Sequence, residues 1–397
     1  MSALLSLEDA QARLLALAPT THSSDLGISP ANAIRFLARD HHAARTQPAA
    51  DLSAMDGYAI CGEGPWQRVG ESRAGAPFAG SLKPGQCVRI STGAHMPQGS
   101  ERVLIQENAI IENAVISAHD IPPAGRHVRK QGFDFARGDR ILKKGDRFSP
   151  AALALAASAG LDNLHVVEPP SVAVLDSGDE LVPPGKALGP HQIPASNGIM
   201  LGSMLRPYVG LVDMLGPVRD DMDALGAALE RARDKHILIT TGGASVGDHD
   251  LMKDALTAWG AQIDFWKVAI KPGKPLLVAT REDDRGTQVI LGLPGNPVSA
   301  YVTCFLFALP LIRAAMGDPA PLPRPCLISA GEDLPAVGPR REFLRAVSDG
   351  SSVRPVASQD SSALRALASA NCLIDRPAGS EKCTAGTQVP VYNLQNG

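Results

Sequence analysis

Three short segments combine glycine, lysine, proline and acidic residues in patterns suited to an anionic ligand. They are residues 240–250 (TTGGASVGDHD), 271–275 (KPGKP) and 293–299 (LPGNPVS). Glycine lets the backbone approach an anion, lysine neutralises the charge of that anion, and aspartate can hold a hard cation such as Mg²⁺. We therefore expect a metal-assisted site for a phosphorylated or otherwise anionic ligand.

Each of these segments follows a short apolar run, at residues 237–239, 265–270 and 289–293. That arrangement predicts three loops at the ends of strands in one open sheet. In α/β sheets, ligands bind outside the carboxyl ends of the strands, where backbone N–H groups and helix N-termini are presented. We expect the three loops to line a single crevice.

Taken singly, each motif also has a purely structural interpretation. The glycine loop matches neither the dinucleotide fingerprint nor a P-loop, and it could be a bare turn. Within its sequel, Asp248 is expected to cap a helix, and Asp250 to face a metal-bound phosphate. Lys271 and Lys274 could be solvated charges, but the prolines around them stiffen the loop and lower the cost of ordering them around an oxyanion. Ser299 would supply a hydroxyl in the first turn of a helix.

Two further acidic groups follow predicted strands. Glu180 comes after the run at residues 172–175, where a carboxylate is well placed for ligand contact, although a helix cap or an exposed loop acid is an open alternative. In the Arg219-Asp220-Asp221 segment we assign Asp221 to cap the next helix and Asp220 to the crevice.

Composition indicates a globular, cytoplasmic protein. The chain has 397 residues, a hydrophobic content of 44% and a formal charge of −3, so it carries no footprint for nucleic acid and is long enough for two to four domains. The N-terminus lacks a basic region, and the longest apolar run, 298–312, is short for a bilayer and contains Pro310. The six cysteines are scattered without a C-x-x-C pair, which favours reduced thiols.

Element patterns predict an α/β multidomain protein. We expect helices at 7–18, from Ser29-Pro30 to about Asp40, and at 151–159, with β-rich runs between residues 47 and 147. Strands and helices then alternate, which predicts a parallel, doubly wound sheet. The predicted domains are a small helical domain (1–45 plus 136–166), an inserted β domain (46–135), a central α/β domain (167–318) and a C-terminal β domain (319–397).

A set of motifs in fixed order resembles the molybdopterin molybdenumtransferases, the MoeA family, which includes the E domain of gephyrin. The resemblance covers nearly the whole chain, and the set is highly specific although each motif alone is weak. The motifs are SAMDGYA (53–59), RISTGAHMP (89–97), RKQGFDF (129–135), SGDEL (177–181), SNG (196–198), RDD (219–221), TGGASVGDHD (241–250), FWKVAIKPGKP (265–275) and GLPGNPVSA (292–300).

The resemblance implies an enzyme of molybdenum cofactor biosynthesis. It implies an elongated homodimer that binds adenylylated molybdopterin and molybdate, releases AMP and inserts molybdenum into the dithiolene with the help of Mg²⁺. Metal-site and catalytic acids would be Asp220, Asp250, Glu180 and, from the β insertion, Asp56. Binding residues would be Gly242, Gly243, Ser245, Lys267, Lys271, Lys274, Pro294, Asn296, Ser299, Thr92, Arg129, Asp134, Arg345 and Ser361. Residues of the β insertion would reach the crevice of the partner subunit.

The sequence departs from the family pattern at several points. Asp176-Ser177 stands where a hydroxyl-threonine pair is more usual, which adds a negative charge beside Glu180, and Phe133 replaces a usual acid. Two alternative functions stay open: adenylylation of molybdopterin, and a catalytically silent scaffold of the gephyrin type. Transient contact with a molybdopterin adenylyltransferase and with acceptor molybdoenzymes would follow from the resemblance.

Overall fold

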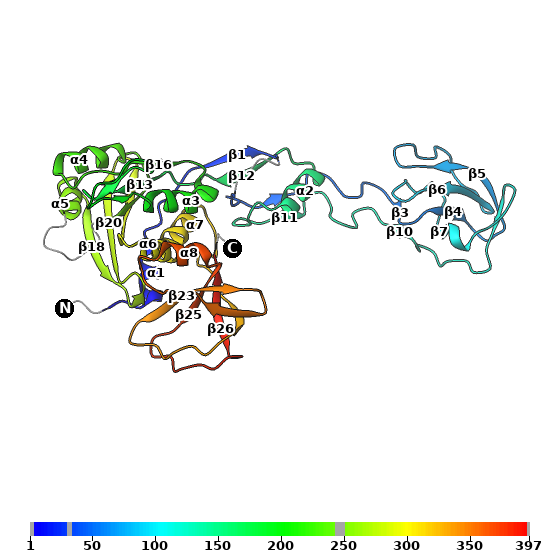
Figure 1. Ribbon diagram of the computed structural model, residues 1–397. Coiled ribbons are helices and arrows are strands. Elements are labelled where there is room, and N and C mark those ends of the chain that lie inside the picture. The colour runs from blue at the N-terminus through cyan, green and yellow to red at the C-terminus, as the bar shows by residue number, and fades with distance from the viewer. Residues whose placement is uncertain (1–3, 30–33, 243–250, 395–397) are drawn as a thin grey trace. The chain divides into compact units, whose positions relative to one another are not determined.

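The computed structural model describes residues 4–29, 34–242 and 251–394, which form two compact units (Figure 1). One unit contains the described residues up to 24, those from 34 to 38 and those from 166 onward. The other contains residues 25–29 and 39–165. The boundaries of the four domains expected from the sequence stay a prediction, because the contacts within the chain divide it into only these two units.

A six-stranded sheet forms the centre of the first unit. Its strands lie in the order β16 (Val212–Met214), β13 (Val172–Asp176), β17 (Ile237–Thr241), β21 (Gly286–Leu293), β20 (Pro275–Asp283) and β18 (Gln262–Lys267). The first four strands are mutually parallel, as predicted, but β20 is antiparallel to both of its neighbours. The expectation of a wholly parallel sheet is therefore wrong at this side, because a tight turn returns β20 directly into β21.

Helices cover both faces of this sheet, which confirms the doubly wound α/β class. On one face α4 (Met222–Arg231) and α5 (Leu251–Ala258) bury leucines against β13, β17 and β21. On the other face lie α1 (Leu7–Leu15), α3 (Asn197–Val209), α6 (Pro297–Thr303) and α7 (Leu309–Ala315). The α1 helix begins as expected, with the Ser6 hydroxyl accepting a hydrogen bond from the Asp9 N–H at 3.0 Å.

The most apolar stretch of the chain is a core helix. A π-helical segment, η2 (Cys304–Ala308), joins α6 to α7, so that 297–315 forms one helical run with a mean hydropathy of 1.7 over its most apolar window. By length and composition this run could cross a membrane, but 89% of that window is buried inside the protein. The π segment precedes Pro310, which has no backbone N–H to donate. Its backbone hydrogen bonds span five residues in place of four at this point of the helix.

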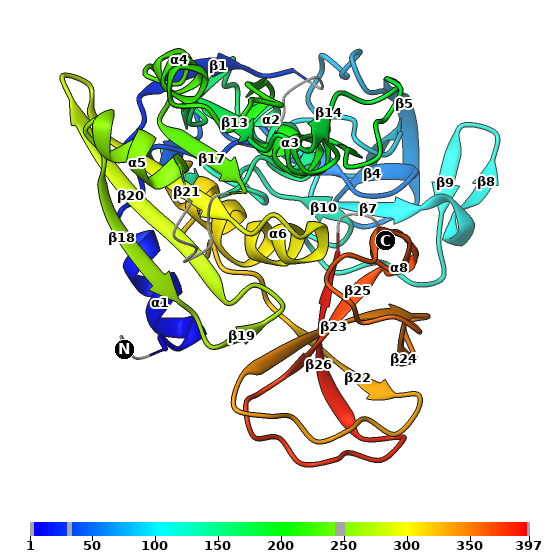
Figure 2. The same cartoon turned by 60° about the vertical axis from the view of Figure 1, so that its left-hand side comes forward.

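The C-terminal strands close on themselves into a small barrel (Figure 2). Strand β23 pairs with both β24 and β25, and the remaining strands complete the circuit. Short β19, which follows β18 in the α/β part, pairs in parallel with the first two residues of β23. The elements are β19 (Ile270–Lys271), β22 (Cys326–Ala330), β23 (Arg341–Ser348), β24 (Ser352–Pro355), α8 (Leu364–Ser369), β25 (Cys372–Arg376) and β26 (Gln388–Asn393).

The second unit is mainly β, as its short apolar runs predicted. Its largest sheet has the order β7 (Arg102–Ile105), β4 (Gly57–Cys61), β6 (Gln86–Ile90), β5 (Trp66–Ser72), β9 (Val115–Ser117) and β8 (Ile110–Glu112). Helix α2 (Pro150–Ser158) begins at its Ser149 cap as expected. The other elements are β2 (His41–His42), β3 (Leu52–Ser53), η1 (Gln106–Asn108), β10 (Val128–Arg129) and β11 (Arg140–Leu142). Strand β1 (Ser23–Gly27) pairs with β12 (Asn163–Val167), and only residues 25–27 and 163–165 of this pair belong to the second unit.

One predicted helix is wrong where the structure describes it. The segment from Ile34 to Asp40 contains no helix, and Leu37 instead bridges Val166 in extended conformation. Phe36 and Leu37 are almost fully buried there, so tertiary burial of two large side chains overrides the proline-initiated helix pattern. Residues 30–33, where that helix would begin, lie outside the described residues.

Candidate functional site

A cavity of about 710 Å³ opens at the carboxyl edge of the six-stranded sheet, which is the side where the parallel strands β13, β17 and β21 end. Strand β18 points the same way as β21, since both are antiparallel to β20, so all the relevant loops meet at this edge. The cavity is lined by the segments that follow β13, β17 and β21, by the connection between β18 and β20, and by the start of α8. Among the predicted site residues, those that line the cavity are Glu180, Gly242, Lys267, Lys274, Pro294 and Asn296.

Two lysines form one wall of the cavity. Lys267 ends β18, and Lys274 immediately precedes β20, with its carbonyl accepting a hydrogen bond from the Val268 N–H at 2.9 Å. Gly273 between them has φ +98°, and a Cβ there would lie 2.6 Å from the Thr303 methyl group. Among the described residues, neither lysine side chain has a hydrogen-bond or ion-pair partner, so both charges are available to a ligand.

Lys271 lies near this wall but does not line the cavity. Its ammonium group pairs with the Glu342 carboxylate at 2.9 Å, where Lys271 is 55% exposed and Glu342 19%. The pairing of β19 with β23 places these two residues opposite each other. An anion bound by Lys271 would therefore compete with Glu342.

The loop after β21 links the cavity to the C-terminal barrel. Asn296 precedes α6, and its side-chain amide donates to the Ser361 hydroxyl at 3.1 Å, while the Val298 N–H donates to the Ser361 carbonyl at 3.0 Å. Ser362 and Leu364, just beyond Ser361, line the cavity. The predicted residue Ser361 thus joins the two parts of the site, whereas Ser299 is buried behind the lining.

Arg345 lies beneath this loop. Its side chain is 1% exposed and donates to the carbonyls of Ser358 and Asp360 at 3.1 and 3.2 Å. Burial lowers the pKa of the Arg345 guanidinium, and its Nε has no partner among the described residues. In this structure Arg345 positions the segment that carries Ser361.

Acidic groups gather at the other end of the cavity. Glu180 lines it, and Asp220 lies nearby on the loop after β16, with its N–H donating to the Asp179 carboxylate at 3.2 Å. Burial of the Asp220 carboxylate, followed by repulsion from Asp179 and Glu180, raises its pKa. Such an excess of negative charge suits a divalent cation. The described residues contain no cluster of three potential metal ligands, and Asp250, Gly243 and Ser245 lie outside them.

Several lining residues are not named as ligand contacts by the sequence analysis, although Thr241 belongs to the glycine loop that is expected to line the crevice. Asp176 and Thr241 end β13 and β17, and Asn197 begins α3, where its amide donates to the Gly295 carbonyl at 2.7 Å. Their signal was available, since each stands at a strand end or a helix start on the carboxyl side of the sheet. In the sequence, Asp176 stands out only as a departure from the family pattern.

Four predicted residues belong to the second unit. The Asp56 carboxylate accepts a hydrogen bond from the Thr92 N–H at 2.7 Å, so these two residues form one local arrangement. Arg129 ends β10 and is exposed, and Asp134 is exposed on the loop that follows. Their contribution to the crevice of a partner subunit stays a prediction.

Three family models together match most of the chain. They are the MoeA N-terminal region (domain I and II) over residues 5–160, a probable molybdopterin binding domain over 173–314, and the MoeA C-terminal region (domain IV) over 328–394.

Curated relatives and solved structures agree with these matches. The chain is 36% identical to molybdopterin molybdenumtransferase 2 of Mycobacterium tuberculosis over 372 residues, which cover 87% of this chain and 89% of that protein. It is 34% identical to the molybdopterin molybdenumtransferase of Bacillus subtilis over 380 residues, or 91% and 87% of the two chains. A crystal structure of a MoeA molybdopterin biosynthesis protein from Pyrococcus horikoshii matches with a TM-score of 0.79 and 27% identity, covering 98% of this chain and 99% of that one.

Proposed function

The chain belongs to the molybdopterin molybdenumtransferase family, and we propose that its carboxyl-edge cavity takes adenylylated molybdopterin and molybdate as substrates. The protein is a transferase of molybdenum cofactor biosynthesis that inserts molybdenum into molybdopterin. The cavity supports the proposal, because it lies at the ligand-binding edge of an α/β sheet and carries unpaired lysines at one end and acids at the other. We further propose that the adenylate is cleaved and AMP released.

Lys267 and Lys274 would neutralise the doubly charged molybdate and the phosphate groups. The backbone of both lysines is held in place, that of Lys267 by β18 and that of Lys274 by the glycine turn at Gly273, so little backbone ordering is needed when an anion binds. Lys271 would join them once it exchanges Glu342 for the anion. Catalysis would then depend on positioning and charge neutralisation, with no nucleophilic serine or cysteine.

Mg²⁺ fits the acidic end of the cavity. Asp220 and Glu180, together with Asp250, would hold the ion, and the raised pKa of Asp220 indicates an arrangement that gains from a bound cation. When bound, Mg²⁺ would supply charge neutralisation for the phosphoric anhydride. A protonated Asp220 would hold it poorly, so activity should fall as the pH falls.

Assembly and location complete the proposal. We propose a homodimer in which Asp56, Thr92, Arg129 and Asp134 serve the partner subunit's cavity, with transient contacts to a molybdopterin adenylyltransferase and to acceptor molybdoenzymes. All six cysteines are free thiols, which supports a reducing, cytoplasmic location.

One reconstituted reaction separates this function from the two alternatives. The protein is given adenylylated molybdopterin and Mg²⁺, and AMP release is measured with and without molybdate. We expect release that depends on molybdate. A scaffold would bind the adenylate without turnover, and an adenylyltransferase would form the adenylate from ATP and molybdopterin; either result would replace the proposed reaction.

A further inference from the structure

Asp176 is a buried carboxylate in the wall of the cavity. It ends β13, lines the cavity and is 5% exposed. Its Oδ1 accepts a hydrogen bond from the Thr241 hydroxyl at 2.5 Å, and its Oδ2 accepts one from the Gly198 N–H at 2.8 Å. A carboxylate offers about four acceptor positions, and these two donors are the only partners of its side chain among the described residues. Acceptor capacity remains for a ligand.

The carboxylate also occupies the N-terminus of helix α3. Gly198 is the second residue of α3, and a Cβ added there would lie 2.5 Å from Asp176 Oδ2, so this approach depends on glycine. A helix N-terminus ordinarily attracts an anionic group of a ligand. Here a protein carboxylate already fills that place, and its negative charge opposes a second anion.

The cavity is therefore polarised along the sheet edge. Strands β17 and β21 separate β13, which ends at Asp176, from β20, which begins beside Lys274. At about 4.8 Å between neighbouring strands, the two ends lie roughly 14 Å apart. A ligand that spans them would place its anionic groups at the lysines or on a Mg²⁺ held by Glu180 and Asp220, and an uncharged group rich in hydrogen-bond donors at Asp176 itself.

We propose that Asp176 is a specificity-determining residue that accepts hydrogen bonds from the donor edge of the pterin ring. That edge carries a ring amide N–H beside an exocyclic amine, two donors that match the two oxygens of a carboxylate. The inference rests on the proposed function, because a pterin is the heterocycle of the proposed substrate. The Asp176 carboxylate offers two acceptor oxygens to these two donors. A serine or threonine at position 176 has a single hydroxyl oxygen and could not make both contacts.

Binding of two uncharged probes tests the assignment. Pterin carries the exocyclic amine, and lumazine carries a carbonyl oxygen in its place, so the full-length protein should bind pterin on the order of tenfold more tightly or better. Asp176→Ser and Asp176→Asn should lose most of this preference. Asp223→Ser, which removes an exposed acid from α4, is the matched control and should keep it.

A third variant keeps the charge but displaces it. Gly198→Ala places a methyl group against Asp176 Oδ2 and should also reduce the preference for pterin. A thermal midpoint equal to that of the parent protein would show that this reduction is not caused by unfolding. If Asp176→Ser does not fold, Asp176→Asn and Gly198→Ala decide the question. A parent protein without preference, or variants that keep it, would overturn the assignment.

Inorganic phosphate supplies an independent readout. Removing the negative charge exposes the α3 N-terminus, so Asp176→Ser should bind phosphate several-fold more tightly than the parent, and unchanged affinity would contradict the blocking role. These measurements need no turnover. A protein that prefers pterin but releases no AMP would leave the role of Asp176 intact and refute the proposed reaction. Normal turnover together with an unchanged preference in Asp176→Ser would support the reaction and refute the role of Asp176.

Discussion

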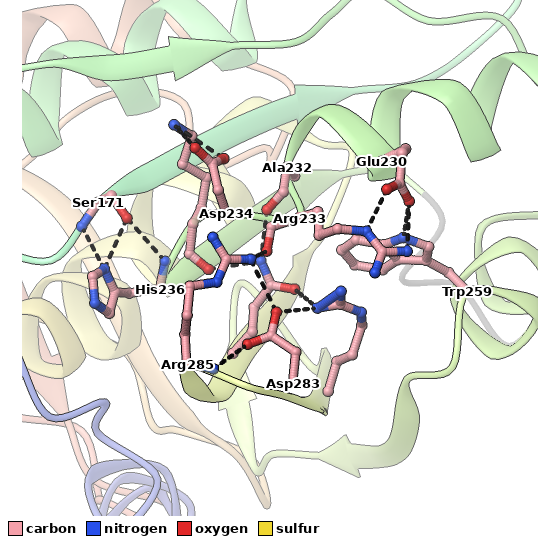
Figure 3. A network of polar contacts seen from close by, with 12 residues as sticks. Ser171, Glu230, Ala232, Arg233, Asp234, His236, Trp259, Asp283 and Arg285 are labelled. Carbon is pink, nitrogen blue, oxygen red and sulfur yellow. Dashed lines mark hydrogen bonds and ion pairs between the residues drawn. The ribbon is translucent and has the colours of Figure 1, made fainter.

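The two edges of the six-stranded sheet both carry many polar side chains, and they use them differently. At the amino edge, Arg281 stacks on the Trp259 ring with 4.3 Å between the guanidinium carbon and the ring centroid, and it donates to Asp283 and Gln288 at 3.2 and 3.3 Å. Asp283 also pairs with Arg285 at 3.0 Å, and the same network includes Glu230 and Arg233 (Figure 3). These charges are paired within the protein.

At the carboxyl edge the charges are left available. Lys267 and Lys274 have no side-chain partner in the described part of the chain, and Asp220 repels its acidic neighbours. An unpaired charge can bind a ligand without first giving up a partner within the protein. Charge pairing thus stabilises this sheet at one edge, while the charges at the other edge remain available for binding.

The largest expected effect is at the carboxyl edge. Lys274→Ala should reduce the rate of molybdate-dependent AMP release about 100-fold, because a pre-placed charge that stabilises the reacting anions is lost. Steady-state kinetics would measure it, with Lys382→Ala on the barrel surface as the control. A change of less than about threefold would remove Lys274 from the site.

The amino edge should give the opposite pattern. Arg281→Met removes a guanidinium that is 5% exposed and should lower the free energy of unfolding by about 2–3 kcal/mol, measured by urea denaturation. Turnover at a permissive temperature should be unchanged. Arg285→Met, on a side chain that is 55% exposed, should cost under about 1 kcal/mol. Equal losses for the two variants would contradict a buried network.

Lys271 lies between the two patterns, since it is exposed and already paired with Glu342. Lys271→Ala should weaken molybdate binding about threefold to tenfold, a smaller loss than at Lys274, with a strong dependence on salt. Glu342→Gln removes the competing carboxylate and should strengthen binding slightly. Identical molybdate titrations for Lys271→Ala and the parent would exclude the contact.

Asp220 should trade stability for cation binding. Because its pKa is raised in the folded state, this carboxyl favours folding below its unfolded-state pKa and loses that contribution as the pH rises through the folded pKa. At neutral pH, Asp220→Asn should therefore raise the thermal midpoint slightly without Mg²⁺ and abolish any further rise on adding Mg²⁺. A parent-like response to Mg²⁺ would argue against a metal site there.

The smallest effect concerns His236 at the amino edge. Its unprotonated Nδ1 accepts hydrogen bonds from the Ser171 N–H and hydroxyl at 3.1 and 2.8 Å. Burial, and then the nearby charges of His22 and Arg285, lower its pKa below 6.5. Its contribution to stability is complete above about pH 6.5 and is lost as the pH falls through the folded pKa. His236→Asn keeps an acceptor and should show a shallower loss of stability between pH 7.5 and 5.5 in urea unfolding.

Features that depend on neighbours in the sequence could be predicted from the sequence alone. The caps at Ser6, Ser149 and Asp221 begin helices as expected, because each cap bonds to an N–H two or three residues away. The alternation of strands and helices likewise predicted the doubly wound α/β class, and the ordered motifs predicted the family. Strand-end loops were expected to share a crevice, and Lys267, Lys274, Glu180 and Asn296 do line one cavity.

Only the tertiary structure decided which of these charges are free. Lys271 meets Glu342, 71 residues further along the chain, and Asp176 meets Thr241, 65 residues away, through strand pairings that no local pattern specifies. The same holds for the extended segment at Leu37 and for the antiparallel course of β20. Residue type and spacing determine which chemistry is possible. Burial and the identity of distant partners determine whether a given charge is paired within the protein or available to a ligand.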